Sequence, residues 1–180
     1  MAGKSNTMKK QLLYCDMDGV IADFDEVILR YDPKVDLKTV PPGNMTTFRD
    51  EVDNICESNP HIFLEINPIP GAIESVKELN ELYEIYFLST PMWNVPESFG
   101  DKRIWLETHF GPIAHKRLIL THRKDLNTGD FLIDDRLTNG SEAFTGHHIH
   151  FGQKPFENWE KVTAYLKNYS NIKKLATINY

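Results

Sequence analysis

Cysteine is scarce in this chain: its 180 residues include only Cys15 and Cys56. The two form no CxxC pair, and no histidines stand at the spacing that a zinc site requires. A disulfide scaffold and a structural zinc centre are therefore both disfavoured. Cys15 lies in an apolar stretch, where cysteine usually behaves as a small buried hydrophobe.

Long apolar runs are missing as well. No stretch approaches the ~20 apolar residues that a helix needs to cross a bilayer. The polar start MAGKSNTMKK lacks the apolar segment of a signal peptide. These absences predict a cytoplasmic protein with no membrane contact.

Positive charge is not in excess, since 20 basic and 26 acidic residues give a net charge of −6. A broad basic face for binding a nucleic acid polymer is therefore not expected. A small phosphorylated substrate is compatible with this charge, because a divalent cation and a few basic side chains can reverse the field inside a pocket. A hydrophobic fraction of 41% is enough for the core of one domain.

Short apolar runs alternate with helical patterns along most of the chain. Alternation of this kind predicts an α/β fold, with a parallel sheet and helices on both of its faces. The strand candidates are residues 11–15, 85–88, 117–120, 131–133 and 148–151, and the helix candidates are residues 72–83, 102–110 and 156–169.

The alternation breaks down between Asp23 and Asn67, where helical pieces flank a Pro41-Pro42-Gly43 breaker. This stretch has no clear strand pattern and follows directly on the first predicted strand. It predicts a small helical cap of residues 23–67, inserted into a core made of residues 8–22 and 68–180 and covering the mouth of a site.

Two carboxylates, Asp16 and Asp18, follow the first predicted strand in the sequence DMDGV. In extended backbone, residues two apart point to the same side, so both can face one ligand. A carboxylate can attack phosphorus, and a second one can serve as the acid and base. The alternative is a solvated turn, since Asp and Gly are common turn residues.

Two hydroxyl residues and a lysine farther along the chain are candidates for contacting a phosphate group. Ser89 and Thr90 end the second predicted strand, where they could donate to phosphate oxygens or merely cap a turn. Lys102 could stabilise the charge of a transferring phosphoryl group. Arg103 and Lys116 are competitors that spacing does not exclude.

A second acidic pair, Asp134 and Asp135, directly follows the apolar run FLI. Adjacent acids repel one another unless a cation or hydrogen bonds compensate them. Magnesium prefers oxygen ligands and typically takes one or two carboxylates together with substrate phosphate. We therefore predict a Mg2+ site formed by Asp16, a carbonyl at Asp18 and one of this pair.

The ordered set DMDGV, FLST, Lys102 and LIDD resembles the haloacid dehalogenase superfamily over roughly residues 10–152. The stretches DMDGVIADFD, FLEINPIPGAIESVKEL, STP with KRIWLETHFG, and LILTHRKDL with LIDDR are similar to the 5'(3')-deoxyribonucleotidases. The resemblance implies a Rossmann-like core with a small helical cap, and hydrolysis of nucleoside monophosphates.

The resemblance also implies roles for individual residues. Asp16 would be the nucleophile and Asp18 the acid and base, and both would bind Mg2+ together with Asp135 or, second, Asp134. Ser89 or Thr90 would hold the phosphate with Lys102. The walls around sugar and base would include Phe24, Met92 and Arg136. The chain departs from the family in the aromatic pair expected to stack the base, for which Phe48 and Phe63 are the possible substitutes.

Two alternatives stay open from the sequence. One keeps the chemistry and changes the substrate to another small phosphate ester, such as a sugar phosphate. The other is a catalytically idle scaffold that binds a nucleotide or protein. The cap surface could also mediate a homodimer.

Overall fold

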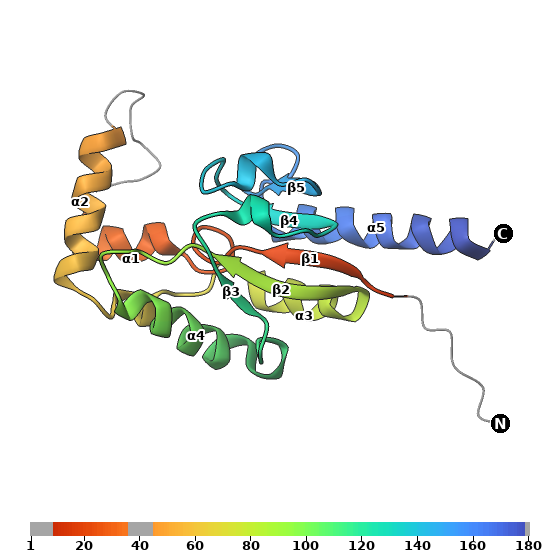
Figure 1. Ribbon diagram of the computed structural model, residues 1–180, viewed down its shortest axis with the longest axis horizontal. Helices are drawn as coiled ribbons and strands as arrows, with labels where there is room; N and C mark the ends of the chain where they lie inside the picture. The colour runs from red at the N-terminus through yellow and green to blue at the C-terminus, as the bar shows by residue number, and fades with distance from the viewer. Residues whose placement is uncertain (1–8, 36–44, 179–180) are drawn as a thin grey trace.

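A five-stranded parallel sheet forms the centre of the protein, with strand order β3-β2-β1-β4-β5 (Figure 1). The computed structural model describes residues 9–35 and 45–178. All five predicted strands are present and the predicted α/β class is confirmed, with end shifts of one or two residues. The strands are β1 (Gln11–Cys15), β2 (Tyr83–Ser89), β3 (Leu118–Leu120), β4 (Phe131–Asp134) and β5 (His147–His150).

Three helices of the core fall where helical patterns were predicted, with different bounds. They are α3 (Ala72–Leu82), α4 (Glu97–Phe110) and α5 (Trp159–Ile178). Helix α4 begins before Lys102, so this lysine lies inside the helix and not at its start. Helix α5 begins at Trp159 and not at Phe156, because the Asn158 side chain accepts from the Lys161 N–H and caps the first turn.

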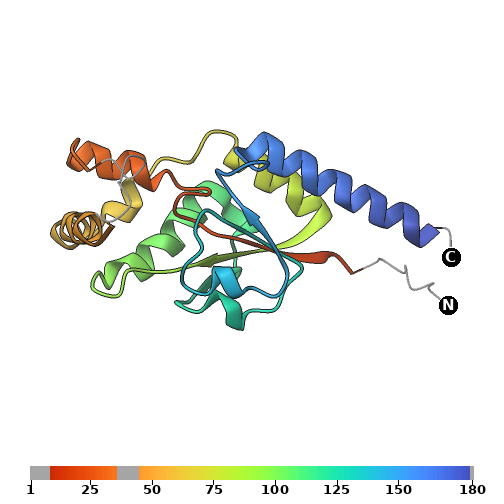
Figure 2. The ribbon, with the colours of Figure 1, turned by 90° about the horizontal axis from the view of Figure 1, so that it is seen from above.

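The prediction that helices cover both faces of the sheet is wrong. Helices α3, α4 and α5 all pack against the face that carries Leu13, Phe87 and Ile133 (Figure 2). Strand order reverses after β3, so right-handed connections to β4 and β5 must cross the opposite face. These connections hold no α-helix and form the 3-10 turns η3 (Lys124–Leu126) and η4 (Ser141–Ala143).

The stretch between the first strand and α3 has no strand in its described residues. It holds α1 (Phe24–Tyr31), α2 (Met45–Ser58) and the 3-10 turn η1 (Ile62–Glu65). The Asp23 N–H donates to the Asn67 carbonyl at 2.8 Å, so the chain leaves and re-enters the core at one point. Helices α1 and α2 lie at the opposite end of the molecule from the end of α5 (Figures 1 and 2).

Polar contacts with α4 help to attach this stretch to the core. The buried Trp105 of α4 donates from Nε1 to the Ile66 carbonyl at 2.7 Å. His61 Nδ1 lies 3.1 Å from the buried Asp101 carboxylate, also on α4. The division into a core and a cap of residues 23–67 stays a prediction, and these contacts show where the two parts would join.

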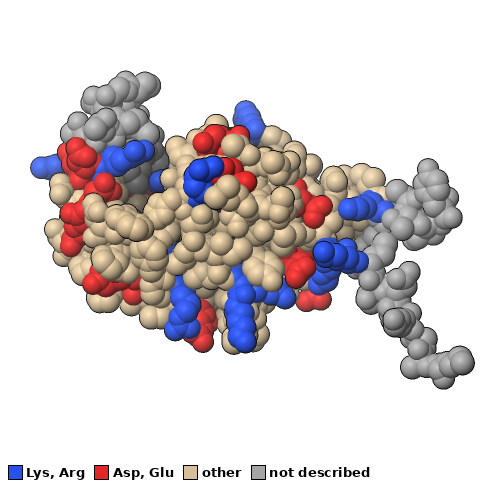
Figure 3. Space-filling model, viewed as in Figure 1, with Lys and Arg blue, Asp and Glu red and all other residues tan. Residues whose placement is uncertain are grey.

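The surface agrees with the mixed composition. Basic and acidic side chains are interspersed on the face seen in Figure 3. Among the described residues, no helix combines the length and apolar content that a membrane crossing demands.

Candidate active site

Polar side chains from four strand ends meet in one cavity of about 680 Å³. Carboxyl ends of parallel strands lie along the same edge of the sheet, and ligands of open α/β sheets bind there. Nearly all predicted site residues line this cavity: Asp16, Asp18, Phe24, Ser89, Thr90, Met92, Asp134, Asp135 and Arg136.

The loop after β1 is a tight turn around the backbone of Met17, whose carbonyl accepts from the Ile21 and Ala22 N–H groups, both at 2.9 Å. Gly19 has a φ of +74°, and a Cβ there would lie 2.4 Å from an Asp135 carboxylate oxygen. Glycine is therefore required twice, for the backbone conformation and for the close approach of Asp135.

Lys102 is the predicted cation that reaches the site. Its side chain is 1% exposed, and Nζ lies 2.6 Å from Asp18 Oδ2 and 3.3 Å from Ser89 Oγ. The competitors do not reach it: Arg103 pairs with Glu107 on the outer side of α4 at 2.8 Å, and Lys116 is exposed in the turn before β3.

A second buried cation, Lys124, was not predicted from the sequence. Its Nζ lies 3.0 Å from Asp16 Oδ2 and 2.5 Å from Asp134 Oδ2, and its backbone N–H donates to the Asn139 carbonyl at 2.8 Å. Burial by itself would lower the pKa of Lys124, but the Asp16 and Asp134 carboxylates raise it above its ordinary value. A basic residue just after the third strand was the available signal, since that strand ends at the same edge.

Asp134 and Asp135 differ in their partners. Asp134 is 1% exposed, with one oxygen bound to Lys124 and the other accepting from the Arg136 N–H at 2.9 Å. Asp135 has a buried Oδ1 with no hydrogen-bond partner, and so does Asp16. Burial raises the pKa of Asp135 to about 7, and burial together with the Asp16 charge raises that of Asp134 to about 6.

This donor set fits a magnesium ion. Asp16, Asp134 and Asp135 each offer a carboxylate oxygen within 4.8 Å of the others. The two unpartnered oxygens, on Asp16 and Asp135, are hard donors that a cation would satisfy.

The two candidate hydroxyls are not equivalent. Ser89 is buried and its Oγ faces Lys102. Thr90 Oγ1 instead donates to the Thr121 carbonyl at 2.9 Å, which links the loops after β2 and β3. Ser89 is therefore the hydroxyl that contacts the charged groups of the site.

Aromatic side chains form the wall toward α1. Phe24 stacks on Phe63, with ring centroids 5.8 Å apart and planes 16° from parallel. The Phe48 side chain lies outside the described residues. Helix α2 adds lining residues that sequence reasoning missed because no motif marks them: Arg49, Val52 and Asp53.

Comparison with known proteins identifies the family. The profile of the family "5' nucleotidase, deoxy (Pyrimidine), cytosolic type C protein" matches residues 10–176. The chain belongs to this family. A putative 5'(3')-deoxyribonucleotidase of Vibrio phage KVP40 is 40% identical over 157 residues, covering 87% of this chain and 85% of that protein. The human cytosolic-type 5'(3')-deoxyribonucleotidase is 35% identical over 155 residues, covering 76% and 77%.

Solved structures agree on the fold of this nucleotidase-family member. The putative haloacid dehalogenase hydrolase YfnB of Bacillus subtilis, bound to magnesium, superposes with a TM-score of 0.59 at 13% identity. The match covers 88% of this chain and 99% of that one. A similar hydrolase from Xanthomonas campestris gives a TM-score of 0.55 at 11% identity, covering 91% and 98%. The predicted class, a phosphoric monoester hydrolase of the deoxyribonucleotidase type, is confirmed at the level of the family.

Proposed function

We propose that this protein hydrolyses (deoxy)ribonucleoside 5'- or 3'-monophosphates through an aspartyl-phosphate on Asp16. The main support is the state of Asp16 itself. One carboxylate oxygen contacts Lys124 at 3.0 Å while the other, Oδ1, is buried without a hydrogen-bond partner. Asp18 lines the same cavity and pairs with Lys102, whose Nζ lies 2.6 Å from Asp18 Oδ2.

The reaction proceeds in two displacements. In the first, an Asp16 oxygen attacks phosphorus, the bond from phosphorus to the nucleoside oxygen breaks, and Asp18 gives its proton to that oxygen. In the second, Asp18 takes a proton from water. The water oxygen then attacks phosphorus, and breaking the bond to Asp16 releases phosphate and restores the carboxylate.

The two lysines have separate tasks. Lys124, between Asp16 and Asp134, holds one oxygen of the nucleophile in place and offsets the mutual repulsion of the two carboxylates. Lys102, between Asp18 and Ser89, places a positive charge where the phosphoryl oxygens would lie. Ser89 adds a hydroxyl donor without adding charge.

The residues that would hold Mg2+ are Asp16, Asp135 and the backbone carbonyl of Asp18. Asp135 is preferred over Asp134 because Lys124 and the Arg136 N–H already occupy both oxygens of Asp134. When bound, the ion would neutralise phosphoryl charge and orient the group for in-line attack. Its positive charge would also keep Asp135 ionised at neutral pH.

The Phe24–Phe63 stack supports a nucleoside as the leaving group, since an aromatic surface binds a planar base well. Met92 and Arg136 line the same cavity and would contact the base and sugar. Residues 23–67 would act as a cap that limits entry to small substrates and excludes water. The names of the relatives support the same substrate class. We place the activity in the cytoplasm.

The test is phosphate release from a panel of deoxyribonucleoside, ribonucleoside and sugar monophosphates, with magnesium and then with EDTA. We expect magnesium-dependent release that favours deoxyribonucleoside monophosphates and falls about a thousandfold or more in Asp16→Asn. The matched control is Glu160→Gln, a carboxyl-to-amide change on the exposed surface of α5.

Covalent trapping separates the mechanism from the substrate. Acid quenching with radiolabelled substrate should leave label on the wild-type protein and none on Asp16→Asn. Preference for a sugar phosphate would contradict the nucleotidase assignment while keeping the mechanism. A folded, magnesium-loaded protein that releases phosphate from no ester would contradict both.

A further inference from the structure

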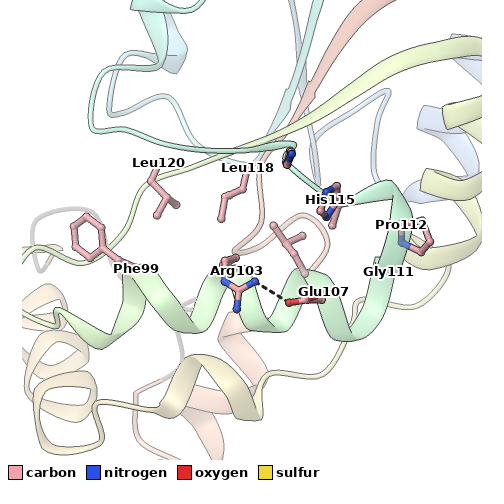
Figure 4. Close-up of a pocket in the computed structure, with 11 residues that line it drawn as sticks. Phe99, Arg103, Glu107, Gly111, Pro112, His115, Leu118 and Leu120 are labelled. Carbon is pink, nitrogen blue, oxygen red and sulfur yellow. Dashed lines mark hydrogen bonds and ion pairs between the residues drawn. The ribbon is translucent and has the colours of Figure 1, made fainter.

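The two edge strands of the sheet differ in what they offer the candidate active site. Beside β3, a second hollow of about 1020 Å³ lies against α4, and its walls share no residue with the catalytic cavity (Figure 4). Beside β5, by contrast, the half-buried His150 contacts the loop that carries Asp135. His150 lies outside the motifs DMDGV, FLST and LIDD. The β5 edge therefore reaches the site from outside the cavity.

His150 donates a hydrogen bond to the main chain of Asp135. Its Nε2 lies 2.9 Å from the Asp135 carbonyl oxygen. Because a carbonyl can only accept, Nε2 carries the proton of this bond, and the neutral ring is in its Nε2–H tautomer. The contact therefore assigns the ring nitrogen that faces Asp135.

The direction of this bond shows that the chain turns at Asp135. The Ile133 carbonyl accepts from the backbone that follows β1, and the Asp134 carbonyl accepts from the Phe151 N–H beyond β5, both at 2.9 Å. Because carbonyls alternate along a strand, that of Asp135 would next point toward β1. It accepts instead from His150 on the β5 side, one residue past the end of the ladder at Asp134.

The turn places the Asp135 carboxylate where a metal ligand is needed. One of its oxygens lies so close to Gly19 that a Cβ there would be 2.4 Å away. An Asp135 oxygen also lies within 4.8 Å of carboxylate oxygens of Asp16 and Asp134. The residue is thus held from two sides, through its carboxylate at the loop after β1 and through its carbonyl at His150. Freeing the carbonyl would widen the range of backbone conformations, and with it the range of carboxylate positions.

We propose that His150 is a positioning residue for Mg2+, which acts through the Asp135 backbone without touching the ion. This inference rests on the proposed function, in which Asp135 is a magnesium ligand. Hydrogen-bond partners behind metal ligands typically contribute about ten- to a hundredfold to metal affinity. His150 reaches the carbonyl and not the carboxylate, so the lower end of that range, about tenfold, is expected.

Two variants of His150 separate the hydrogen bond from the bulk of the side chain. Gln and Met are similar in length and shape, but only Gln carries an N–H donor near the position of Nε2. Magnesium affinity is measured by urea unfolding over a magnesium series, because an ion that binds only the folded state stabilises it by an amount set by its dissociation constant. His150→Met should raise this constant about tenfold, and His150→Gln should stay within about threefold of the wild type.

His148→Met is the matched control. His148 lies two residues earlier on the same side of β5, with its ring centroid 5.7 Å from that of His150. Its buried Nε2 has no hydrogen-bond partner among the described residues. His148→Met should therefore leave the magnesium dissociation constant unchanged, whatever it does to stability in EDTA. Phosphate release gives a second readout: excess magnesium should restore the kcat of His150→Met but not that of Asp135→Asn.

Three results would overturn the proposal: an unchanged dissociation constant in His150→Met, an equal rise in His150→Gln, and an equal rise in His148→Met. A wild-type protein that magnesium does not stabilise would overturn it together with the magnesium site. The constants are measured without substrate, so they decide the proposal even if the protein releases phosphate from no nucleotide. If His150→Met does not fold, NMR of the imidazole nitrogens in the wild type decides: the Nε2–H tautomer of His150 supports the proposal and the Nδ1–H tautomer overturns it.

Discussion

Removing the negative charge of Asp135 should make the metal-free protein more stable while abolishing its response to magnesium. Asp135 is partly buried and packs against Gly19, and its buried Oδ1 has no hydrogen-bond partner. Arg136 provides most of the attraction that offsets its charge, with Nε at 3.6 Å, and Lys124 adds a weaker attraction. Without a metal ion this carboxylate therefore destabilises the fold. Asp135→Asn should raise the free energy of unfolding by removing its charge.

The magnitude follows from the pKa of Asp135, which burial raises from 3.8 to about 7. A carboxyl whose pKa is higher in the folded state binds its proton more tightly there, so its stability contribution is lost as pH rises. The loss begins near the unfolded pKa of 3.8 and is complete above about 7. At about pH 8 the difference corresponds to up to about 4 kcal/mol.

The assay is urea unfolding in EDTA at about pH 5 and about pH 8, followed by the fluorescence of the buried Trp105 and Trp159. We expect Asp135→Asn to exceed the wild type in free energy of unfolding at the higher pH and to approach it at the lower one. Burial raises the pKa of Asp134 in both proteins, and because Asp134 and Asp135 repel one another, loss of the Asp135 charge changes the stability in the same direction.

Magnesium supplies the second half of the test. Binding to the folded state alone should stabilise the wild type in proportion to the logarithm of magnesium concentration, and should leave the variant unchanged. The reasoning would be refuted if Asp135→Asn were less stable than the wild type in EDTA at about pH 8. Equal stabilisation of both proteins by magnesium would refute the assignment of Asp135 as a ligand.

Three further changes probe the same cavity. Gly19→Ala should destabilise the fold by about 1–2 kcal/mol and weaken magnesium binding in a titration. Its control is Gly100→Ala in α4, where a Cβ meets open space; this change should stabilise the fold by about 0.5–1 kcal/mol. Lys124→Met should lower the free energy of unfolding in urea by about 3–5 kcal/mol at neutral pH. Part of this loss should be recovered near pH 5, because the uncompensated carboxyls take up protons there. A loss that does not depend on pH would contradict this reasoning. Phe24→Leu should raise KM for nucleoside monophosphates roughly three- to tenfold and leave KM for ribose 5-phosphate unchanged, and an equal rise for both would argue against base stacking.

The position of the candidate site at one edge of the sheet could be predicted from the sequence because it depends on local patterns. Each of the runs before Asp16, Ser89 and Asp134 is apolar enough to be a buried strand and ends abruptly in polar residues. Parallel strands place their carboxyl ends along one edge of the sheet, so these three polar clusters lie together whatever conformation the loops adopt. The confirmed family resemblance rests on those same residues.

Tertiary structure decided how the charges are paired. In the sequence, Lys124 is one basic residue among 20; it lies in the family-like stretch LILTHRKDL, but nothing in that stretch assigns it a partner or a role. Only the reversal of strand order brings the loop after β3 over the Asp16–Asp134 pair. The same loop places Lys124 against Asp134 and not against the buried Oδ1 of Asp135. Because the two residues are identical and adjacent, the sequence does not reveal this difference between them.

The one-sided helical cover was likewise decided in three dimensions. The sequence determined that strands and helices alternate, and periodicity showed which residues are apolar. Periodicity does not record on which face of the sheet a connection crosses, because that depends on the direction in which the next strand is added. The strand order set that direction, leaving the second face to 3-10 turns and β3 at an open edge.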